Sequence, residues 1–211
     1  MSPELLQELP PLERLALTYA PRRSRSATLA LLALDRRLGA GVAAASEPLI
    51  GQLKLAWWRD RLGEGKEAWP RGEPLLAQLA AWPGEASSLV ALVDGWEAQL
   101  TAAPGVTALR DLAAGRSAAW LALAEGFGER GEEAIAKAAH RWTYAQFAST
   151  SDGAAAQRLA AAPHPGPLPR SVRSLAVLDG VSARSAGRAG RGLPNAASAV
   201  LYAMRLGIFG R

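Results

Sequence analysis

Apolar residues recur at helical spacing along most of this 211-residue chain, and proline or glycine separates each apolar run from the next. A first helix is expected between Pro10 and Pro21. Further helices are expected over residues 24–45, 46–62, 85–101, 106–127, 132–150, 170–187 and 194–208, with a proline-rich loop at 163–169 before the last two. No region alternates with the period of two that strands need. The pattern therefore predicts an all-α protein of about eight helices, forming a single domain over residues 1–211.

The helix expected over residues 46–62 carries two apolar stripes on adjoining faces. The first stripe holds Ile50, Leu53 and Trp57, and the second holds Leu55, Trp58 and Leu62. Ser46 is the expected N-cap, and Pro48 falls in the first helical turn, where proline is favoured.

The composition is that of a globular protein, with 49% apolar and 20% charged residues. Alanine and leucine dominate, which favours helix. The chain has no cysteine, which excludes a disulfide framework, a cysteine nucleophile and a thiolate metal site. No basic segment precedes an apolar run at the N-terminus, and no apolar stretch is long enough to span a membrane. We therefore expect a cytoplasmic protein that can lie at the periphery of the inner membrane.

The net charge of +5 comes from the C-terminal part of the chain. Residues 1–150 hold 16 Lys/Arg against 17 Asp/Glu, whereas residues 151–211 hold 8 arginines against 2 aspartates. Such an excess suits nucleic acid, an anionic membrane surface or an acidic partner, and it equally suits an arginine-rich proteome without any binding role. The cluster GRAGRG at 187–192 has no interleaved aromatic residue for base stacking, so nucleic acid is not an expected partner.

Carboxylates one turn apart on facing helices can hold Mg²⁺ in an all-α protein. Asp94 and Glu97 form such a pair, but no second helix repeats it in matching form. The residues alone therefore do not support a metal centre, and no cofactor is expected. Five tryptophans on predicted helices are expected in the core, with an apolar cavity as the alternative: Trp57, Trp58, Trp96, Trp120 and Trp142.

Three segments, in the same order along the chain, resemble the squalene/phytoene synthase family. They are PRRSRSATLALLALDRRL at 21–38, LVDGWEAQL at 92–100 and AHRWTYAQFASTSDGA at 139–154. A fourth, EPLIGQLKLAWWRDRL at 47–62, is similar to the branch of that family related to the mitochondrial complex I assembly factor 6. The resemblance implies an isoprenoid-synthase-like helical fold, in which aspartates hold Mg²⁺ ions that help a prenyl diphosphate to ionise.

The family's metal-binding aspartates are missing from this chain. Their positions are taken by Gly39, Ala40, Ala43, Gln99, Thr150 and Ala154, and a family arginine is replaced by Ser149. Asp152 lies within the third segment, but it is displaced by two residues from either of the positions that the resemblance implies, 150 and 154. Without these carboxylates the charge of a diphosphate has no metal bridge, so its ionisation is hard to support.

The resemblance and the lost aspartates together predict a non-catalytic family member, which binds an isoprenoid or another lipid or serves as an assembly or scaffold factor. Arg36, Asp94, Gln99 and Gln146 are the predicted residues of its remaining cleft, although helix-face hydrogen bonding and capping explain them equally well. The expected partners are an isoprenoid or other lipid, a membrane surface, or a respiratory-complex protein.

The alternative is an active prenyltransferase that condenses prenyl diphosphates, with Asp94, Glu97 and Asp152 as substitute Mg²⁺ ligands. A nucleic-acid-binding role for the C-terminal arginines is the third hypothesis, and it predicts affinity that falls as salt rises. The contents of the centre of the helical bundle distinguish a lipid carrier from a scaffold protein. A bound isoprenoid there favours a carrier, whereas a centre filled by side chains favours a scaffold.

Overall fold

The computed structural model describes residues 2–101, 104–148 and 153–186, and within these ranges the chain is helical and has no strand. The α-helices are α1 (Pro3–Glu8), α2 (Pro11–Thr18), α3 (Arg22–Ala43), α4 (Pro48–Gly63), α5 (Pro74–Leu79), α6 (Val90–Glu97), α7 (Val106–Gly126), α8 (Glu132–Gln146), α9 (Gly153–Ala160) and α10 (Arg173–Ala186). Short 3₁₀ helices lie at Lys66–Ala68, Ala86–Leu89 and Arg170–Val172. The prediction of an all-α protein is confirmed.

Seven of the eight expected helices fall in the described ranges, and they are present as α2, α3, α4, α6, α7, α8 and α10. The eighth, expected over 194–208, lies outside the described residues. The prediction of about eight helices misses α1, α5 and α9, which have 6, 6 and 8 residues. Helices α1 and α5 complete fewer than two turns, so a 3.6-residue period does not stand out in their sequence.

Proline rather than a polar side chain marks the start of the two helices that flank residue 46. Pro21 is the N-cap of α3, and Pro48 is the first residue of α4, where its missing N–H leaves no hydrogen bond unmade. The prediction of Ser46 as N-cap is wrong. Glu47 takes that position, and its side chain makes no capping hydrogen bond.

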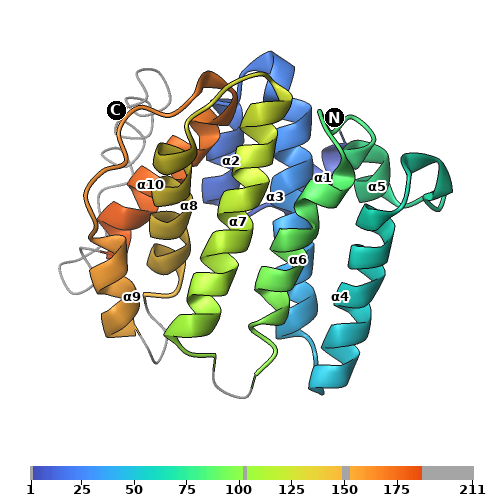
Figure 1. Ribbon diagram of the computed structural model, residues 1–211, viewed down its shortest axis with the longest axis horizontal. Coiled ribbons are helices and arrows are strands. Elements are labelled where there is room, and N and C mark those ends of the chain that lie inside the picture. The colour runs from blue at the N-terminus through green and yellow to red at the C-terminus, as the bar shows by residue number, and fades with distance from the viewer. Residues whose placement is uncertain (1, 102–103, 149–152, 187–211) are drawn as a thin grey trace.

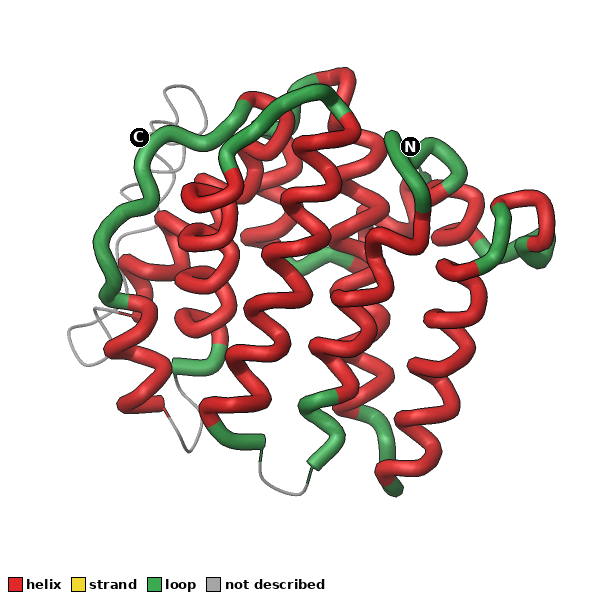
Figure 2. The backbone as a smooth tube through the Cα atoms, viewed as in Figure 1, coloured by secondary structure: helices red, strands yellow, loops and turns green. Residues whose placement is uncertain are grey.

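The helices form two layers (Figure 1). In one layer α9, α8, α7, α6 and α4 stand side by side, and each packs against the next. The second layer contains α10, α2 and α3, and α3 packs against both α6 and α7. Most of the loops that connect the helices lie at the two ends of the bundle (Figure 2). None of the described helices combines the length and the apolar character that crossing a bilayer needs.

The core lies between the layers, and alanine and leucine supply most of it. Its largest side chains are Trp120 and Trp142, each 1% exposed, with their rings edge to face at a centroid distance of 6.5 Å. The prediction of core tryptophans is confirmed for these two and for Trp58. It is wrong for Trp57, which is 40% exposed on α4.

Glycines allow α6 and α7 to approach each other closely. A Cβ atom on Gly95 of α6 would lie 2.9 Å from Leu112 Cα, and one on Gly115 of α7 would lie 2.3 Å from the carbonyl oxygen of Ala91. Both neighbours are backbone atoms, which cannot give way unless a whole helix shifts. The close contact of these two central helices therefore depends on the absence of side chains at both positions.

Gly115→Ala should lower the free energy of unfolding by about 1–3 kcal/mol, because the added methyl group forces α6 and α7 apart. Gly41→Ala is the matched control, since a Cβ there meets nothing within 4 Å. Alanine at position 41 should raise the free energy of unfolding by about 0.5–1 kcal/mol, through its better helix propensity. Urea denaturation of the two variants checks both signs. A Gly115→Ala variant as stable as the natural chain would contradict the close contact.

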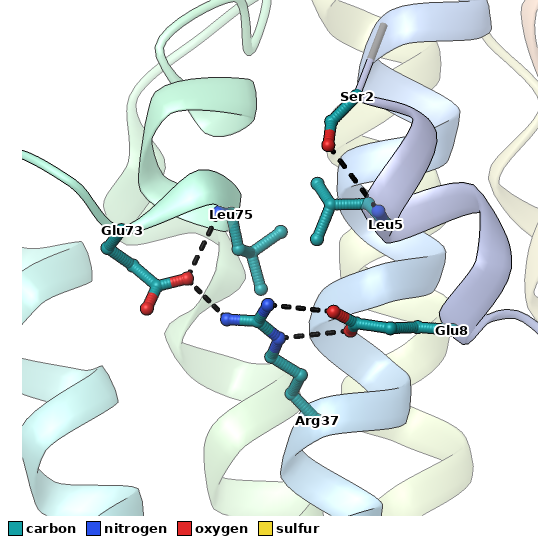
Figure 3. Close-up of polar contacts among 6 residues, drawn as sticks. All are labelled: Ser2, Leu5, Glu8, Arg37, Glu73 and Leu75. Atoms are coloured by element: carbon teal, nitrogen blue, oxygen red, sulfur yellow. Dashed lines mark hydrogen bonds and ion pairs between the residues drawn. The ribbon is translucent and has the colours of Figure 1, made fainter.

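Arg37 ties the short helices α1 and α5 to α3 (Figure 3). Its Nη2 and Nε atoms donate to the two carboxylate oxygens of Glu8 at 3.0 and 3.1 Å, and its Nη1 atom donates to Glu73. Glu73 also accepts from the backbone N–H of Leu75 at 3.1 Å and so caps α5. These hydrogen bonds, with Glu8 contributing most, raise the pKa of Arg37. The guanidinium thus has a structural role.

Candidate functional site

Asp35 of α3 and Arg116 of α7 form an ion pair at the centre of the bundle, with both side chains 4% exposed. Arg116 Nη2 donates to Asp35 Oδ2 at 2.9 Å, and Nε donates to Oδ1 at 3.1 Å, which is a bidentate arrangement. Trp96 Nε1 donates to the same Oδ1 at 2.8 Å. Both oxygens of the buried carboxylate therefore have partners, which offsets the loss of hydration.

The rest of the Arg116 guanidinium is held as firmly. Its Nη1 atom donates to Gln146 Oε1 at 2.7 Å and to Thr143 Oγ1 at 3.3 Å. Its central carbon lies 4.3 Å from the ring centroid of Trp142 and 5.4 Å from that of Trp96, so aromatic faces cover it. The cation could turn toward a ligand only by giving up several of these contacts.

The space beside this ion pair is small. In the described chain it is lined by Asp35, Arg116, Leu31, Leu32, Leu92, Trp120 and Trp142, and it has no room for a water molecule. Small-molecule sites in proteins usually offer about 300–1,000 Å³. Among the residues that the structure describes, the centre is therefore packed, and a lipid chain could enter it only after side chains had moved.

Glu13 of α2 adds a second carboxyl group near the ion pair. The residue is 3% exposed, and its Oε2 atom has no hydrogen-bond partner in the described chain. Burial raises the pKa of Glu13 to about 7, and the negative charge of Asp35 adds to the effect, whereas Arg36 and Arg116 oppose it. Glu13 is thus able to take up a proton near neutral pH.

A second buried ion pair joins α8 to α10. Arg141 Nε lies 3.0 Å from Asp179 Oδ1, and the Asp179 side chain is fully buried. The contact lacks hydrogen-bond geometry, so neither carboxylate oxygen of Asp179 accepts a hydrogen bond from the described residues. Burial raises the pKa of Asp179 to about 7, although the charge of Arg141 opposes the shift.

Protonation of Glu13 and Asp179 should make the chain more stable at mildly acidic pH. Their ordinary pKa values are 4.5 and 3.8, and both rise to about 7 on folding. Between these limits the folded state binds more protons than the unfolded state. The contribution of these two groups to the free energy of unfolding is therefore complete below about pH 4, and it is lost as pH rises to about 7. For each group the slope is at most about 1.4 kcal/mol per pH unit.

The comparison with Asp179→Asn isolates this effect. Burial lowers the pKa of His140 and His164, and those two groups oppose the trend below their ordinary value of 6.5. Asp179→Asn should therefore show a smaller gain in the free energy of unfolding from pH 7 to pH 5 than the natural chain, by urea denaturation. Asp111→Asn, at an exposed position of α7, should leave the natural dependence intact. Equal slopes for all three proteins would contradict the assignment.

The predicted cleft residues Arg36, Gln99 and Gln146 lie in different surroundings. Gln146 reaches the central network through its contact with Arg116. Gln99 is buried after the end of α6, and its Nε2 atom donates to the carbonyl oxygen of Ala108 at 2.7 Å. Arg36 is exposed on α3. Of these three residues, the structure brings only Gln146 to the centre of the bundle.

Arg59 of α4 binds Asp94 and Glu97, two of the carboxylates named as substitute Mg²⁺ ligands in the prenyltransferase alternative. Its Nε and Nη2 atoms donate to Asp94 Oδ1 at 3.0 and 2.5 Å, and Nη2 also donates to Glu97 Oε2 at 2.6 Å. The third candidate ligand, Asp152, lies outside the described residues. In the described ranges no three acidic or histidine side chains gather closely enough to hold a metal ion. One oxygen of each of Asp94 and Glu97 is thus paired with a guanidinium.

The segments that resemble squalene/phytoene synthases converge on the central network. Residues 21–38 supply Asp35, residues 92–100 supply Trp96, and residues 139–154 supply Gln146. Compared with protein-family models, curated proteins and solved structures, the chain has no match. The family resemblance and the isoprenoid-synthase-like architecture stay predictions, which rest on the segments quoted above.

The sequence prediction omits Asp35 and Arg116. The apolar pattern of α7 nevertheless indicates that Arg116 is buried. Leu109, Ala113 and Trp120 form an apolar stripe at helical spacing, and Arg116 stands inside it. A charged residue within an apolar stripe needs a buried partner of opposite charge. That requirement points to a buried acid on a neighbouring helix, but it does not say which one.

Proposed function

We propose that this chain is a non-catalytic scaffold or assembly protein of the squalene/phytoene synthase type, which acts by holding a partner protein. The observation that carries this proposal is the packed centre. There the Asp35–Arg116 ion pair and the surrounding tryptophans fill the space that a carrier or a synthase would need for a lipid chain.

The charge of the centre also supports a structural role. Arg116 is neutralised by Asp35, so it is not available to compensate the negative charge of a diphosphate. The positions at which the resemblance implies metal-binding aspartates, Gly39, Ala40 and Ala43, carry no polar side chain. A prenyl diphosphate would therefore meet no carboxylate set for Mg²⁺ at these positions of α3, and the exposed Arg36 alone would not replace the metal ions.

The resemblance of residues 47–62 to the branch of a complex I assembly factor narrows the proposed partner. We take it to be a protein component of a respiratory complex, met at the periphery of the inner membrane. A lipid-carrier role is the weaker proposal, because it needs the side chains of the centre to rearrange.

Incubation of the purified protein with farnesyl or geranylgeranyl diphosphate and Mg²⁺ tests the proposal. We expect no diphosphate release above a blank without protein, and no heat of binding by calorimetry. Release that disappears in the Asp94→Ala variant would overturn the proposal in favour of the prenyltransferase. Tight binding without release would overturn it in favour of a lipid carrier.

A further inference from the structure

A pocket of about 280 Å³ lies between α8 and α9, which stand side by side at one end of their layer (Figure 1). Its residues on α8 recur every three or four positions, so they form one face of that helix. The pocket shares no lining residue with the small space beside the Asp35–Arg116 ion pair. The described residues that line it are Lys137, His140, Arg141, Tyr144, Leu159, Ala162 and Pro163.

Arg141 brings a buried guanidinium to this pocket. Its side chain is 10% exposed, and in the described chain its contact with an opposite charge is the one with Asp179, 3.0 Å from Nε. Among the described residues Nε has no hydrogen-bond acceptor, and neither carboxylate oxygen of Asp179 has a donor. A guanidinium carries five N–H groups, and buried donors without an acceptor are costly. Arg141 is therefore able to donate to an acceptor that enters from the pocket.

The other lining groups give the pocket an apolar wall. The residues of α9 and of the segment after it carry no polar side chain here. On the α8 side, the rings of His140 and Tyr144 lie edge to face with their centroids 6.1 Å apart. Lys137 is the second cation, but it pairs with Glu133 at 2.5 Å. No carboxylate is among the described lining residues, so Arg141 is the cation that is best placed to hold an anion.

We propose that this pocket binds a small monocarboxylate with an apolar body, whose carboxylate accepts hydrogen bonds from Arg141. The planar guanidinium matches the two oxygens of a carboxylate. One guanidinium beside an apolar wall suits a monoanion better than a phosphate, which carries a charge close to −2. The volume is at the lower end of the range of about 300–1,000 Å³ for small-molecule sites, so a long lipid chain does not fit. This site is independent of the function proposed above.

Asp179 limits the affinity of the site. Its carboxylate lies on the Nε side of the Arg141 guanidinium, and its negative charge opposes that of an incoming carboxylate. Asp179→Asn keeps the shape of the side chain and removes the charge. This variant should therefore bind the monocarboxylate several-fold more tightly than the natural chain, a result that a purely structural ion pair would not produce.

Calorimetric titration of the purified chain with benzoate tests the proposal. Benzamide is the matched ligand, because it has nearly the same shape and no charge. We expect the natural chain to bind benzoate at least tenfold more tightly than benzamide or inorganic phosphate. The same titration of Asp179→Asn should show the gain in affinity for benzoate and little change for benzamide.

Two lining positions give variants that weaken binding. Arg141→Lys keeps a cation beside the buried Asp179 but loses the planar fork, so its affinity for benzoate should fall about tenfold. Ala162→Phe should abolish binding by filling the pocket, and it leaves the ion pair untouched. Ala161→Phe is its matched control, since Ala161 is exposed and is not a lining residue. That control should bind benzoate as the natural chain does.

Three results would overturn the proposal. The first is a natural chain that does not bind benzoate at any concentration up to its solubility. The second is benzoate binding that Ala162→Phe leaves unchanged, which would place the ligand elsewhere. The third is a natural chain that binds benzamide or phosphate as tightly as benzoate, which would assign the pocket to neutral apolar ligands or to phosphate.

Discussion

Arg116→Met should lower the free energy of unfolding by about 3–5 kcal/mol, because Asp35 is then buried without its counter-charge. Methionine is unbranched and fills much of the arginine volume, so the loss reports mainly the missing charge. In a chain of this size the melting temperature should fall on the order of 10 °C. Urea and thermal denaturation followed by circular dichroism measure both quantities.

Two further variants separate charge from packing. Arg110→Met, at an exposed position of the same helix, should change the free energy of unfolding by no more than about 0.5 kcal/mol. The double variant Asp35→Leu with Arg116→Met should recover most of the loss, since a matched apolar pair can replace a buried ion pair. Arg116→Met with natural stability would mean that Asp35 and Arg116 are hydrated, which contradicts a closed centre.

Trp120→Ala should lower the free energy of unfolding by about 3–5 kcal/mol, because the large side chain is 1% exposed and leaves a cavity. The cavity would lie beside the Asp35–Arg116 ion pair, among Leu31 and Leu92. Chemical denaturation measures the loss. Trp120→Phe, which keeps an aromatic ring against Trp142, should lose clearly less.

Benzene offers a second measurement on the same variant. An apolar cavity left by a large side chain stays dry and can bind benzene. Saturating benzene should therefore raise the melting temperature of Trp120→Ala and leave that of the natural chain unchanged. A natural chain that benzene stabilises as strongly would already contain a central cavity, contrary to the packed centre.

The helical class and seven of the helices are predictable from the sequence because they depend on local information. A long amphipathic helix such as α7 repeats its apolar period over several turns, and proline marks the start of α4. The short helices α1 and α5 are not predictable in this way. Their packing against α3 includes the hydrogen bonds of Arg37 to Glu8 and Glu73, which are distant in sequence.

The candidate site could be predicted only in part, because its geometry depends on which residue of a helix faces inward. The sequence singles out Arg36 as the arginine of the family-like segment, whereas the neighbouring Asp35 is the buried residue. Successive helix positions differ by about 100° around the axis, so an error of one position replaces a core residue by a surface residue. Gln146 was predictable because it continues the apolar face of α8 that includes Trp142.

The apolar pattern of α4 also leaves open which side of the helix faces the core. Its two stripes are visible in the sequence, but periodicity does not say which stripe meets the core. The structure buries Leu55 and Leu62 and exposes Leu53. A helix with two apolar stripes at the edge of a layer can turn only one of them toward the core, so the other stays exposed.

A crystal structure of the purified natural chain tests the central claim most directly, through the electron density between Leu31, Leu92 and Trp120. The account predicts side-chain density only, with Arg116 Nη2 about 2.9 Å from Asp35 Oδ2. Elongated density of an isoprenoid or another lipid at this place, with the ion pair broken or moved aside, would contradict it.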